Sequence, residues 1–459
     1  MEERKVRAGE NPLGYEKIGS LLGKFAIPSI ISMLVGSLYN IVDQFFIGRS
    51  VGPLGNAATN IAFPLSISCV ALGLLFGIGG ASTSNIALGQ KKEEEAADYM
   101  GNAISMLFIS GLVLGIFSEA FLPILLKFFG SPEDVYPYAL TYTRITCIGM
   151  PFLILTTGGG NLIRADGRPK NAMICNLSGA ILNTILDALF VFGFKWGIAG
   201  AAWATIIGQT LSAVLGIYYL ANCRTIDLKW KNLRLKMATV IRVASLGTAA
   251  FTNQIAMMVV QIVMNNSLKY YGALSNYGEA IPIACAGIIS KVNGIFISIV
   301  VGISQGLQPI VSFNHGAGNH KRVREGYMTA IKAGAVLAVL VFVAFQVFPR
   351  QIIGIFGDGS KEYFDFGVKY LRVFMFFTFL NFVQPISSNF FTAIGSPKVG
   401  MFLSLTRQII YLLPLILVLP LFIGIDGIMY AGPVADFLAA FTTAFMVIRE
   451  LGKPVYRGM

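Results

Sequence analysis

Apolar residues along this chain gather into twelve runs, each of about 20 residues or more, with short polar connections between them. An apolar helix of about 20 residues is long enough to cross the hydrocarbon core of a bilayer. Both faces of the runs are apolar, so the pattern predicts membrane spans and not amphipathic helices on a membrane surface. The predicted spans are 25–47, 60–84, 101–123, 139–160, 171–194, 197–221, 243–266, 281–306, 327–348, 368–392, 400–423 and 426–448.

The composition agrees with a membrane protein. Of the 459 residues, 55% are hydrophobic and only 13% are charged, whereas a soluble domain carries about 25% charged residues. The connections are too short for a separate soluble catalytic or nucleotide-binding domain. The five cysteines are scattered with no close pair, which predicts free thiols and no metal site. The expected fold is therefore an all-α membrane protein with twelve transmembrane helices.

The basic residues predict how the chain is oriented. Net charge is +12, and in a membrane protein such residues indicate topology and not a nucleic-acid surface. The segments on the side of both termini carry 24 Lys and Arg residues, including those of 164–170, and the opposite connections carry seven. Because basic loops stay in the cytoplasm, we expect both termini on the cytoplasmic side of the inner (plasma) membrane.

The two halves of the chain resemble each other. Residues 161–181 (NLIRADGRPKNAMICNLSGAI) and 389–409 (NFFTAIGSPKVGMFLSLTRQI) are identical at eight of 21 positions without gaps. Two six-helix units offset by about 228 residues are therefore expected, and because six is even, both units enter the membrane from the same side. Two pseudo-symmetric six-helix bundles around a central cleft are an attested transporter architecture. A duplicated bundle that serves as a channel or a scaffold is the alternative.

The predicted boundaries follow from these two units. The connection between the halves is the most basic segment, with six Lys and Arg residues. We expect a cytoplasmic tail at 1–24, an N-terminal lobe at 25–223, a basic cytoplasmic linker at 224–242, a C-terminal lobe at 243–450 and a cytoplasmic tail at 451–459.

Two acidic residues lie well inside the apolar helices of the first half, Asp43 in the first span and Asp187 in the fifth. A charge at mid-bilayer costs about 2.5–3.5 kcal/mol on insertion scales, and residues that bear this cost usually mark an ion or proton path. Other polar residues recur at helical intervals beside each of them, so both spans carry one polar stripe. The stripes contain Tyr39, Asn40 and Asp43 in the first span, and Asn176, Gly179, Asn183 and Asp187 in the fifth.

The oxygen atoms of these stripes indicate the chemistry. With the hydroxyl of Thr205 in the sixth span, the two carboxylates and the Asn183 amide offer hard ligands for a shared proton or for a small cation such as Na⁺. Two carboxylates that approach each other would titrate as a coupled unit. The alternative is that each is hydrogen-bonded and silent. The second half has Leu415 at the repeat position of Asp187, and this asymmetry favours a specific site over a scaffold role.

Two further residues in the membrane have two interpretations each. Arg407, in the eleventh span, either lines the cleft or extends toward the cytoplasmic surface. Pro28 either permits a kink in the helix that carries Asp43 or is simply tolerated near a helix start. The candidates for substrate binding or gating are Tyr39, Asn40, Asn176, Arg407 and Pro28.

Several motifs resemble the multidrug and toxic compound extrusion (MATE) family, and most closely its DinF branch. They are YNIVDQFFIGRSVG at 39–52, RADGRPK at 164–170, NTILDALFVFGFKWGIAGAAWAT at 183–205 and GISQGLQPIVSFNHGAGN at 302–319. The resemblance covers nearly the whole chain. It implies a cation site in the N-terminal lobe at Asp43, Asn183, Asp187 and Thr205, with Pro28 matching the proline of the first span. The C-terminal acidic site of the NorM branch has no match, because the seventh span offers Gln261 and the tenth has no acid.

The resemblance also implies a function. Members of this family export cationic or amphipathic drugs and toxic compounds in exchange for inward H⁺ or Na⁺, by alternating access. The expected partners are small organic cations and the lipid bilayer, for a monomer that binds no nucleic acid and has no cofactor beyond the coupling ion. An acidic cavity attracts organic cations, and aromatic and methionine side chains accept their flat rings.

Other functions predict different residues. A lipid-linked oligosaccharide flippase of the same superfamily needs a strongly basic cavity for a pyrophosphate headgroup, whereas the clearest central charges here are aspartates. A membrane-embedded enzyme needs a catalytic constellation such as HExxH or a nucleophile with its base, and the sequence offers none. A channel is a further alternative, which uphill flux driven by an ion gradient would exclude. Export by antiport is therefore favoured, and the flippase is the alternative.

Overall fold

The computed structural model describes residues 11–278, 280–355 and 360–457, and these residues form helices and connections with no strand. Within these ranges, twelve helices are long and apolar enough to cross a membrane, as predicted. Most helices extend beyond the apolar runs. The first span, α2, begins at Ile18, before the predicted lobe start at residue 25, and α9 begins at Met237, inside the segment predicted as the linker.

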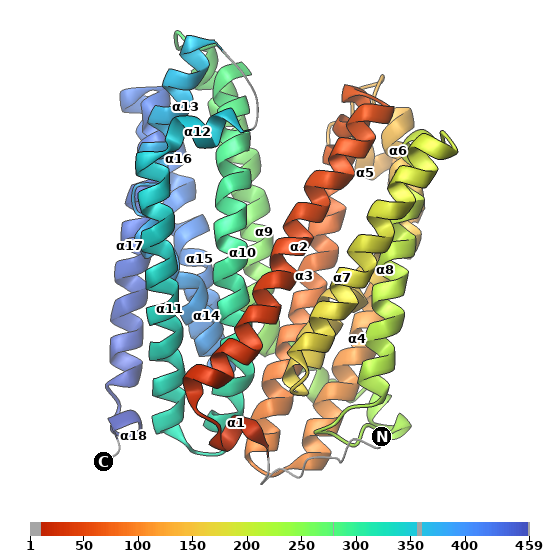
Figure 1. Cartoon of the computed structure of the whole chain (residues 1–459), viewed down its shortest axis with the longest axis vertical. Helices are drawn as coiled ribbons and strands as arrows, with labels where there is room; N and C mark the ends of the chain where they lie inside the picture. The colour runs from red at the N-terminus through yellow and green to blue at the C-terminus, as the bar shows by residue number, and fades with distance from the viewer. Residues whose placement is uncertain (1–10, 279, 356–359, 458–459) are drawn as a thin grey trace.

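The first six spans form the N-terminal lobe and the last six form the C-terminal lobe (Figure 1). The spans of the N-terminal lobe are α2 (Ile18–Ser50), α3 (Pro53–Gly89), α4 (Glu93–Ala120), α6 (Tyr136–Ala165), α7 (Pro169–Asp187) with η2 (Ala188–Gly193), and α8 (Gly197–Ala221). Those of the C-terminal lobe are α9 (Met237–Ala273), α10 (Ala280–Gly316), α11 (His320–Val347), α13 (Lys361–Phe374) with η4 (Thr378–Leu380) and α14 (Val383–Ala393), α15 (Pro397–Leu405) with η5 (Thr406–Leu412) and α16 (Leu413–Ile423), and α17 (Ile425–Leu451). Short helices α1 (Pro12–Tyr15), α5 (Leu122–Phe128), η3 (Trp230–Leu233), α12 (Pro349–Gly354) and α18 (Pro454–Arg457) complete the described chain.

The internal repeat marks equivalent helix starts. Pro169 is the first residue of α7, and Pro397 is the first residue of α15. Proline is favoured at this position because its missing N–H would have no partner within the helix. Both spans later pass through a π-helical turn, η2 or η5, although at different repeat positions. The two lobes therefore share their helix order but differ in local geometry.

The first and last described helices, α1 and α18, lie at the same end of the molecule, which we call the terminal end, and the lobes diverge toward the opposite, far end (Figure 1). The lobes meet where α3 packs against α9 and α2 packs against α10. Glycines permit the closest approach: a side chain at Gly79 would overlap the carbonyl of Val243, and one at Gly247 would overlap the carbonyl of Leu75. These contacts hold the lobes together in the terminal half.

The hydrophobic core follows the same division. The largest buried cluster crosses between the lobes, because it joins Leu21 and Phe25 of α2 to Leu307 and Ile310 of α10. The far half of the C-terminal lobe has its own cluster, which includes Tyr370. Two smaller clusters stabilise the far half of the N-terminal lobe. Each lobe is therefore packed separately at the far end.

The connection between the lobes lies against α4 of the N-terminal lobe. The buried Asn102 side chain donates to the carbonyls of Asn232 and Arg234 at 3.1 and 3.2 Å. Its amide oxygen accepts the backbone N–H of Lys236 at 2.8 Å. The residues directly before α9 are therefore fixed to the N-terminal lobe and do not form a loose loop.

Candidate functional site

A cavity of about 660 Å³ lies between the lobes. Its walls come from α2, α3, α6, α7 and α8 of the N-terminal lobe and from α9, α10, α14 and α15 of the C-terminal lobe. Among the described residues of its lining, Asp43 is the single acidic side chain and Arg164 the single basic one. The predicted central cleft is therefore confirmed, and the carboxylate of the first span belongs to its wall.

The four residues expected to bind a coupling ion come together in the N-terminal lobe. Asp43 on α2, Asn183 and Asp187 on α7, and Thr205 on α8 are all more than nine-tenths buried. The Asn183 amide donates to the Thr205 hydroxyl at 3.4 Å, and the Tyr39 hydroxyl donates to the same oxygen at 3.3 Å. The carboxylates of Asp43 and Asp187 are close enough to interact electrostatically.

Four oxygen atoms of this cluster have no hydrogen-bond partner in the described part of the chain. They are Oδ1 of Asp43, Oδ1 of Asn183 and both carboxylate oxygens of Asp187. Buried polar atoms are almost always paired, and leaving one unpaired costs about 1–3 kcal/mol. A proton on a carboxylate, or a Na⁺ ion among these oxygens, would remove that cost. These oxygen ligands therefore fit either a proton or a hard cation.

The packing of α7 on α8 explains why the cluster forms. Asn183 and Asp187 are four residues apart, so they share one face of α7. Two turns earlier on that helix, the carbonyl of Cys175 accepts a hydrogen bond from Ser212 of α8 at 2.8 Å. This contact holds the two helices together at one end, and further along them Thr205 reaches Asn183.

Tyr142 of α6 belongs to the same site, although no sequence pattern indicates it. It lines the cavity, and its side chain lies near both Asp43 and Asp187. In the repeat, Tyr142 aligns with Tyr370, which is buried in the core of the C-terminal lobe. A tyrosine shared by both halves suggests a packing role, and this hides the position of Tyr142 beside the carboxylates.

The other candidate residues of the N-terminal lobe divide into two groups. Tyr39, Asn40 and Asn176 line the cavity. Pro28 is buried in the terminal half of α2, outside the cavity lining, and the helix is continuous through it. The first group can contact a molecule in the cavity, whereas Pro28 can act only through the helix.

Arg407 of η5 forms an internal ion pair of the C-terminal lobe. Its Nε atom lies 2.6 Å from Oδ1 of Asp436, and Asn381 donates to Oδ2 of Asp436 at 2.9 Å. Arg407 is not part of the cavity lining, and its side chain is only 14% exposed. Neither sequence interpretation of Arg407 is correct. The charge stays inside the lobe because the Asp436 carboxylate compensates it.

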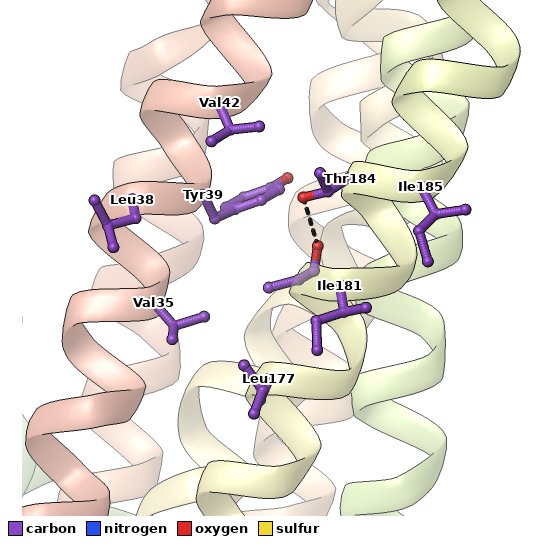
Figure 2. A pocket seen from close by; sticks show the side chains of 9 residues that line it. Val35, Leu38, Tyr39, Val42, Leu177, Ile181, Thr184 and Ile185 are labelled. Carbon is purple, nitrogen blue, oxygen red and sulfur yellow. Dashed lines mark hydrogen bonds between the residues drawn. The ribbon is translucent and has the colours of Figure 1, made fainter.

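A smaller groove of about 280 Å³ lies between α2 and α7 (Figure 2). It is lined mainly by apolar side chains, and Leu38 and Ile185 are exposed at its outer side. Val35 and Tyr39 line both this groove and the central cavity. Figure 2 shows the Tyr39 ring extending from α2 toward α7. Tyr39 is therefore part of the wall between the cavity and the apolar outer surface.

Arg164 lies in a helix where the hydrophobicity pattern predicts a connection. The fourth apolar run ends at residue 160, so Arg164 counts among the basic residues outside the spans. In the structure α6 continues to Ala165, and Arg164 is only 3% exposed. The prediction of a loop residue is therefore wrong, because the helix extends beyond its apolar run and carries the arginine into the cavity wall.

Comparisons with known proteins agree with this architecture. The family model described as MatE matches residues 28–189 and 249–417, one segment in each lobe and together more than half of the chain. The multidrug export protein MepA of Staphylococcus haemolyticus is 24% identical over 424 residues, which cover 92% of this chain and 92% of that protein.

Solved structures match nearly the whole fold. One, described as a complex of the MATE multidrug transporter DinF-BH, is 31% identical with a TM-score of 0.87 and covers 96% of this chain and 98% of that chain. A MOP superfamily transporter from Pyrococcus furiosus is 20% identical with a TM-score of 0.89, covering 98% of this chain and 100% of that chain. At this lower identity the likeness concerns the fold alone.

Proposed function

The chain belongs to the MatE family, and from this premise we propose that it is a secondary active antiporter of the plasma membrane. It exports cationic or amphipathic drugs and other toxic compounds in exchange for inward H⁺ or Na⁺. The names of its relatives, a multidrug export protein and a multidrug transporter, support this substrate class. The observation that carries the proposal is the group of unpartnered, buried oxygens at Asp43, Asn183 and Asp187 beside the cavity between the lobes.

The position of Asp43 suggests how ion and substrate are coupled. Asp43 belongs to the buried carboxylate cluster and also lines the cavity, so an ion and a cationic substrate would compete for one carboxylate. A proton or Na⁺ at the cluster lowers its negative charge and releases the substrate. The membrane potential adds to the driving force when more positive charge enters than leaves, because each net charge that moves inward releases about 2.3 kcal/mol per 100 mV.

Alternating access fits the contacts between the lobes. With both termini in the cytoplasm, the terminal end is the inner side, so the lobes touch on the inner side and diverge outward (Figure 1). In the second conformation α2 and α3 would separate from α10 and α9 at the terminal end, and the cavity would open to the cytoplasm. One chain contains the complete cavity, which supports a monomer as the functional unit.

The test is ethidium transport in proteoliposomes that contain the full-length protein. A pH jump and a Na⁺ jump are imposed separately on wild type, Asp187→Asn and Asp426→Asn. Asp426 is the matched control, because it is an aspartate outside the cluster that pairs with Lys369 at 2.7 Å and is partly exposed. We expect one of the two gradients to drive uphill transport in wild type and in Asp426→Asn, and we expect Asp187→Asn to lose it while still binding the dye.

Two outcomes would contradict the proposal. Normal gradient-driven transport by Asp187→Asn would show that this carboxylate does not couple the ion. If neither gradient moves a cationic dye in wild type, antiport is wrong and a lipid-linked oligosaccharide flippase has to be tested instead. The cavity itself gives the flippase little support, since Arg164 is the single basic side chain among the described lining residues.

A further inference from the structure

Arg164 is an almost completely buried charge in the wall of the transport cavity. It lies one residue before the end of α6, at the terminal end, and 3% of its surface is exposed. Thr157, Gly160 and Asn161 line the cavity from the same face of α6, at helical intervals from Arg164. The guanidinium is therefore part of the binding surface of the cavity and not a surface charge.

No acidic side chain in the described part of the chain balances this charge. Nη2 of Arg164 donates to the side-chain oxygen of Asn161 at 2.8 Å, and the buried Nη1 has no hydrogen-bond partner. Two other arginines with largely buried side chains are compensated, because Arg168 and Arg407 each pair with an aspartate. An uncompensated buried charge is strongly destabilising. Arg164 therefore lacks the anion that Arg168 and Arg407 have.

The internal repeat shows that packing alone does not require a cation at this position. The same face of α6 and of its repeat counterpart, α14, lines the cavity in both lobes. The aligned positions are Thr156, Thr157, Gly160, Asn161 and Arg164 on α6, and Gln384, Pro385, Ser388, Asn389 and Thr392 on α14. The neutral Thr392 takes the place of Arg164 in the second half, so the charge is a property of one half and not of the duplicated fold.

Arg164 lies far from the carboxylate cluster. Tyr142, which lies near Asp43, is on the same helix as Arg164 and 22 residues before it. At a rise of 1.5 Å per residue these two positions on α6 are about 33 Å apart. The cavity therefore has its acidic group in the far half and its basic group near the terminal end, and the aspartates do not neutralise Arg164 locally.

We propose that Arg164 is an anion subsite that binds the carboxylate, sulfonate or phosphate group of an amphipathic substrate at the terminal end of the cavity. The planar guanidinium matches such oxyanions in bidentate geometry, and it keeps its charge at any physiological pH. The substrate range then includes zwitterions and organic anions as well as cations. This inference rests on the proposed function, because it names a second substrate class for the same cavity.

Two dyes that differ in one charged group provide the test. Rhodamine B carries a free carboxylate, and its ethyl ester has the same ring system without that charge. Full-length protein in detergent is titrated with each dye, and fluorescence anisotropy reports binding for wild type, Arg164→Gln and Arg164→Lys. We expect Arg164→Gln to weaken rhodamine B binding about tenfold or more and to change ester binding less than twofold. Arg164→Lys keeps the charge but loses the bidentate geometry of the guanidinium. Its affinity for rhodamine B should therefore lie between those of wild type and Arg164→Gln.

Arg144→Gln is the matched control, because Arg144 lies on the same helix but is exposed and paired with Glu119 at 3.0 Å. It should leave binding of both dyes unchanged. Equal weakening of both dyes by a folded Arg164→Gln protein, or no weakening of either, overturns the proposal. If Arg164→Gln does not fold, competition on the wild type decides. Naphthalene-2-sulfonate should then displace rhodamine B at concentrations that leave the ester bound, and failure to do so overturns the proposal.

A third measurement distinguishes a free inorganic ion from the anionic group of a substrate. Inorganic phosphate is added to the wild type in place of the sulfonate. If phosphate displaces rhodamine B as effectively as the aromatic sulfonate does, the site holds a free ion and the assignment to substrates is wrong. Gradient-driven transport of the cationic ester in proteoliposomes tests the proposed antiport separately. Loss of that transport alone would contradict the antiport and leave the anion subsite intact.

Discussion

The hydroxyl of Tyr39 donates a hydrogen bond to the hydroxyl of Thr205 at 3.3 Å, which connects α2 to α8 beside the buried carboxylates. Thr205 also accepts a hydrogen bond from Asn183 of α7 at 3.4 Å, so one oxygen atom links three helices. The ring of Tyr39 has a separate role, because it belongs to the wall between the central cavity and the groove of Figure 2. The hydroxyl and the ring can be tested independently.

Tyr39→Phe removes the hydrogen bond and keeps the ring. The loss of one buried hydrogen bond costs about 1 kcal/mol, so we expect the apparent affinity for the coupling ion to fall roughly fivefold while ethidium binding is retained. Tyr39→Ala also removes the wall, and ethidium should then leak from loaded vesicles without a gradient. The measurements are ion-dependent initial rates and passive dye retention. Identical behaviour of the two variants would show that the ring does not act as a barrier.

Asp43→Asn and Asp187→Asn should be strongly non-additive. If both carboxylates hold one ion, either substitution destroys the site, and each should lower the gradient-driven efflux rate more than tenfold. The double variant should be no worse than the more severe single variant, since groups that act as a unit are lost together. Initial rates in proteoliposomes at equal protein content check this. Losses that multiply in the double variant would indicate two independent sites.

Removing one partner of the ion pair between Arg407 and Asp436 should destabilise the protein more than removing both partners. Arg407→Gln leaves the buried Asp436 carboxylate without its cation, which should destabilise the C-terminal lobe by about 3–5 kcal/mol. Replacing both residues, with Arg407→Met and Asp436→Leu, should recover most of the loss because no unpaired charge remains. Thermal unfolding in detergent measures both effects. A double variant that melts as early as Arg407→Gln would show that the pair is not the cause.

The glycine contacts between the lobes predict a variant that opens the terminal end. Gly247→Val places a branched side chain against the carbonyl of Leu75, so the lobes should separate there. Spin labels at the exposed Lys229 and Lys321, one on each side of the lobe boundary, should report a distance several ångströms longer than in wild type. Gly287→Val is the control, since an added side chain there meets no atom within 4 Å. An unchanged distance in Gly247→Val would mean that this contact does not hold the lobes together.

The sequence predicts the spans and the repeat because a bilayer admits few helix lengths and demands apolar surfaces. The same cost makes polar residues such as Asp43, Asn183 and Asp187 visible as candidates, and the structure brings them together with Thr205. Whether they bind the coupling ion stays a prediction.

Arg164 and Arg407 show where prediction from the sequence ends. A basic residue just beyond an apolar run has the same pattern whether it enters a loop or the wall of a cavity. Arg164 is in the wall because α6 continues past the run. The partner of Arg407 lies on another helix, and pairing between helices depends on how they pack and not on any spacing along the chain.

The fixed connection before α9 restricts how the two halves can move. Because Asn102 binds the backbone up to Lys236, the polypeptide that joins the lobes is free to bend only at the start of α9. A joint at one point permits rotation and prevents sliding. Separation of the lobes at the terminal end is then smallest where α9 begins and grows with distance from that joint.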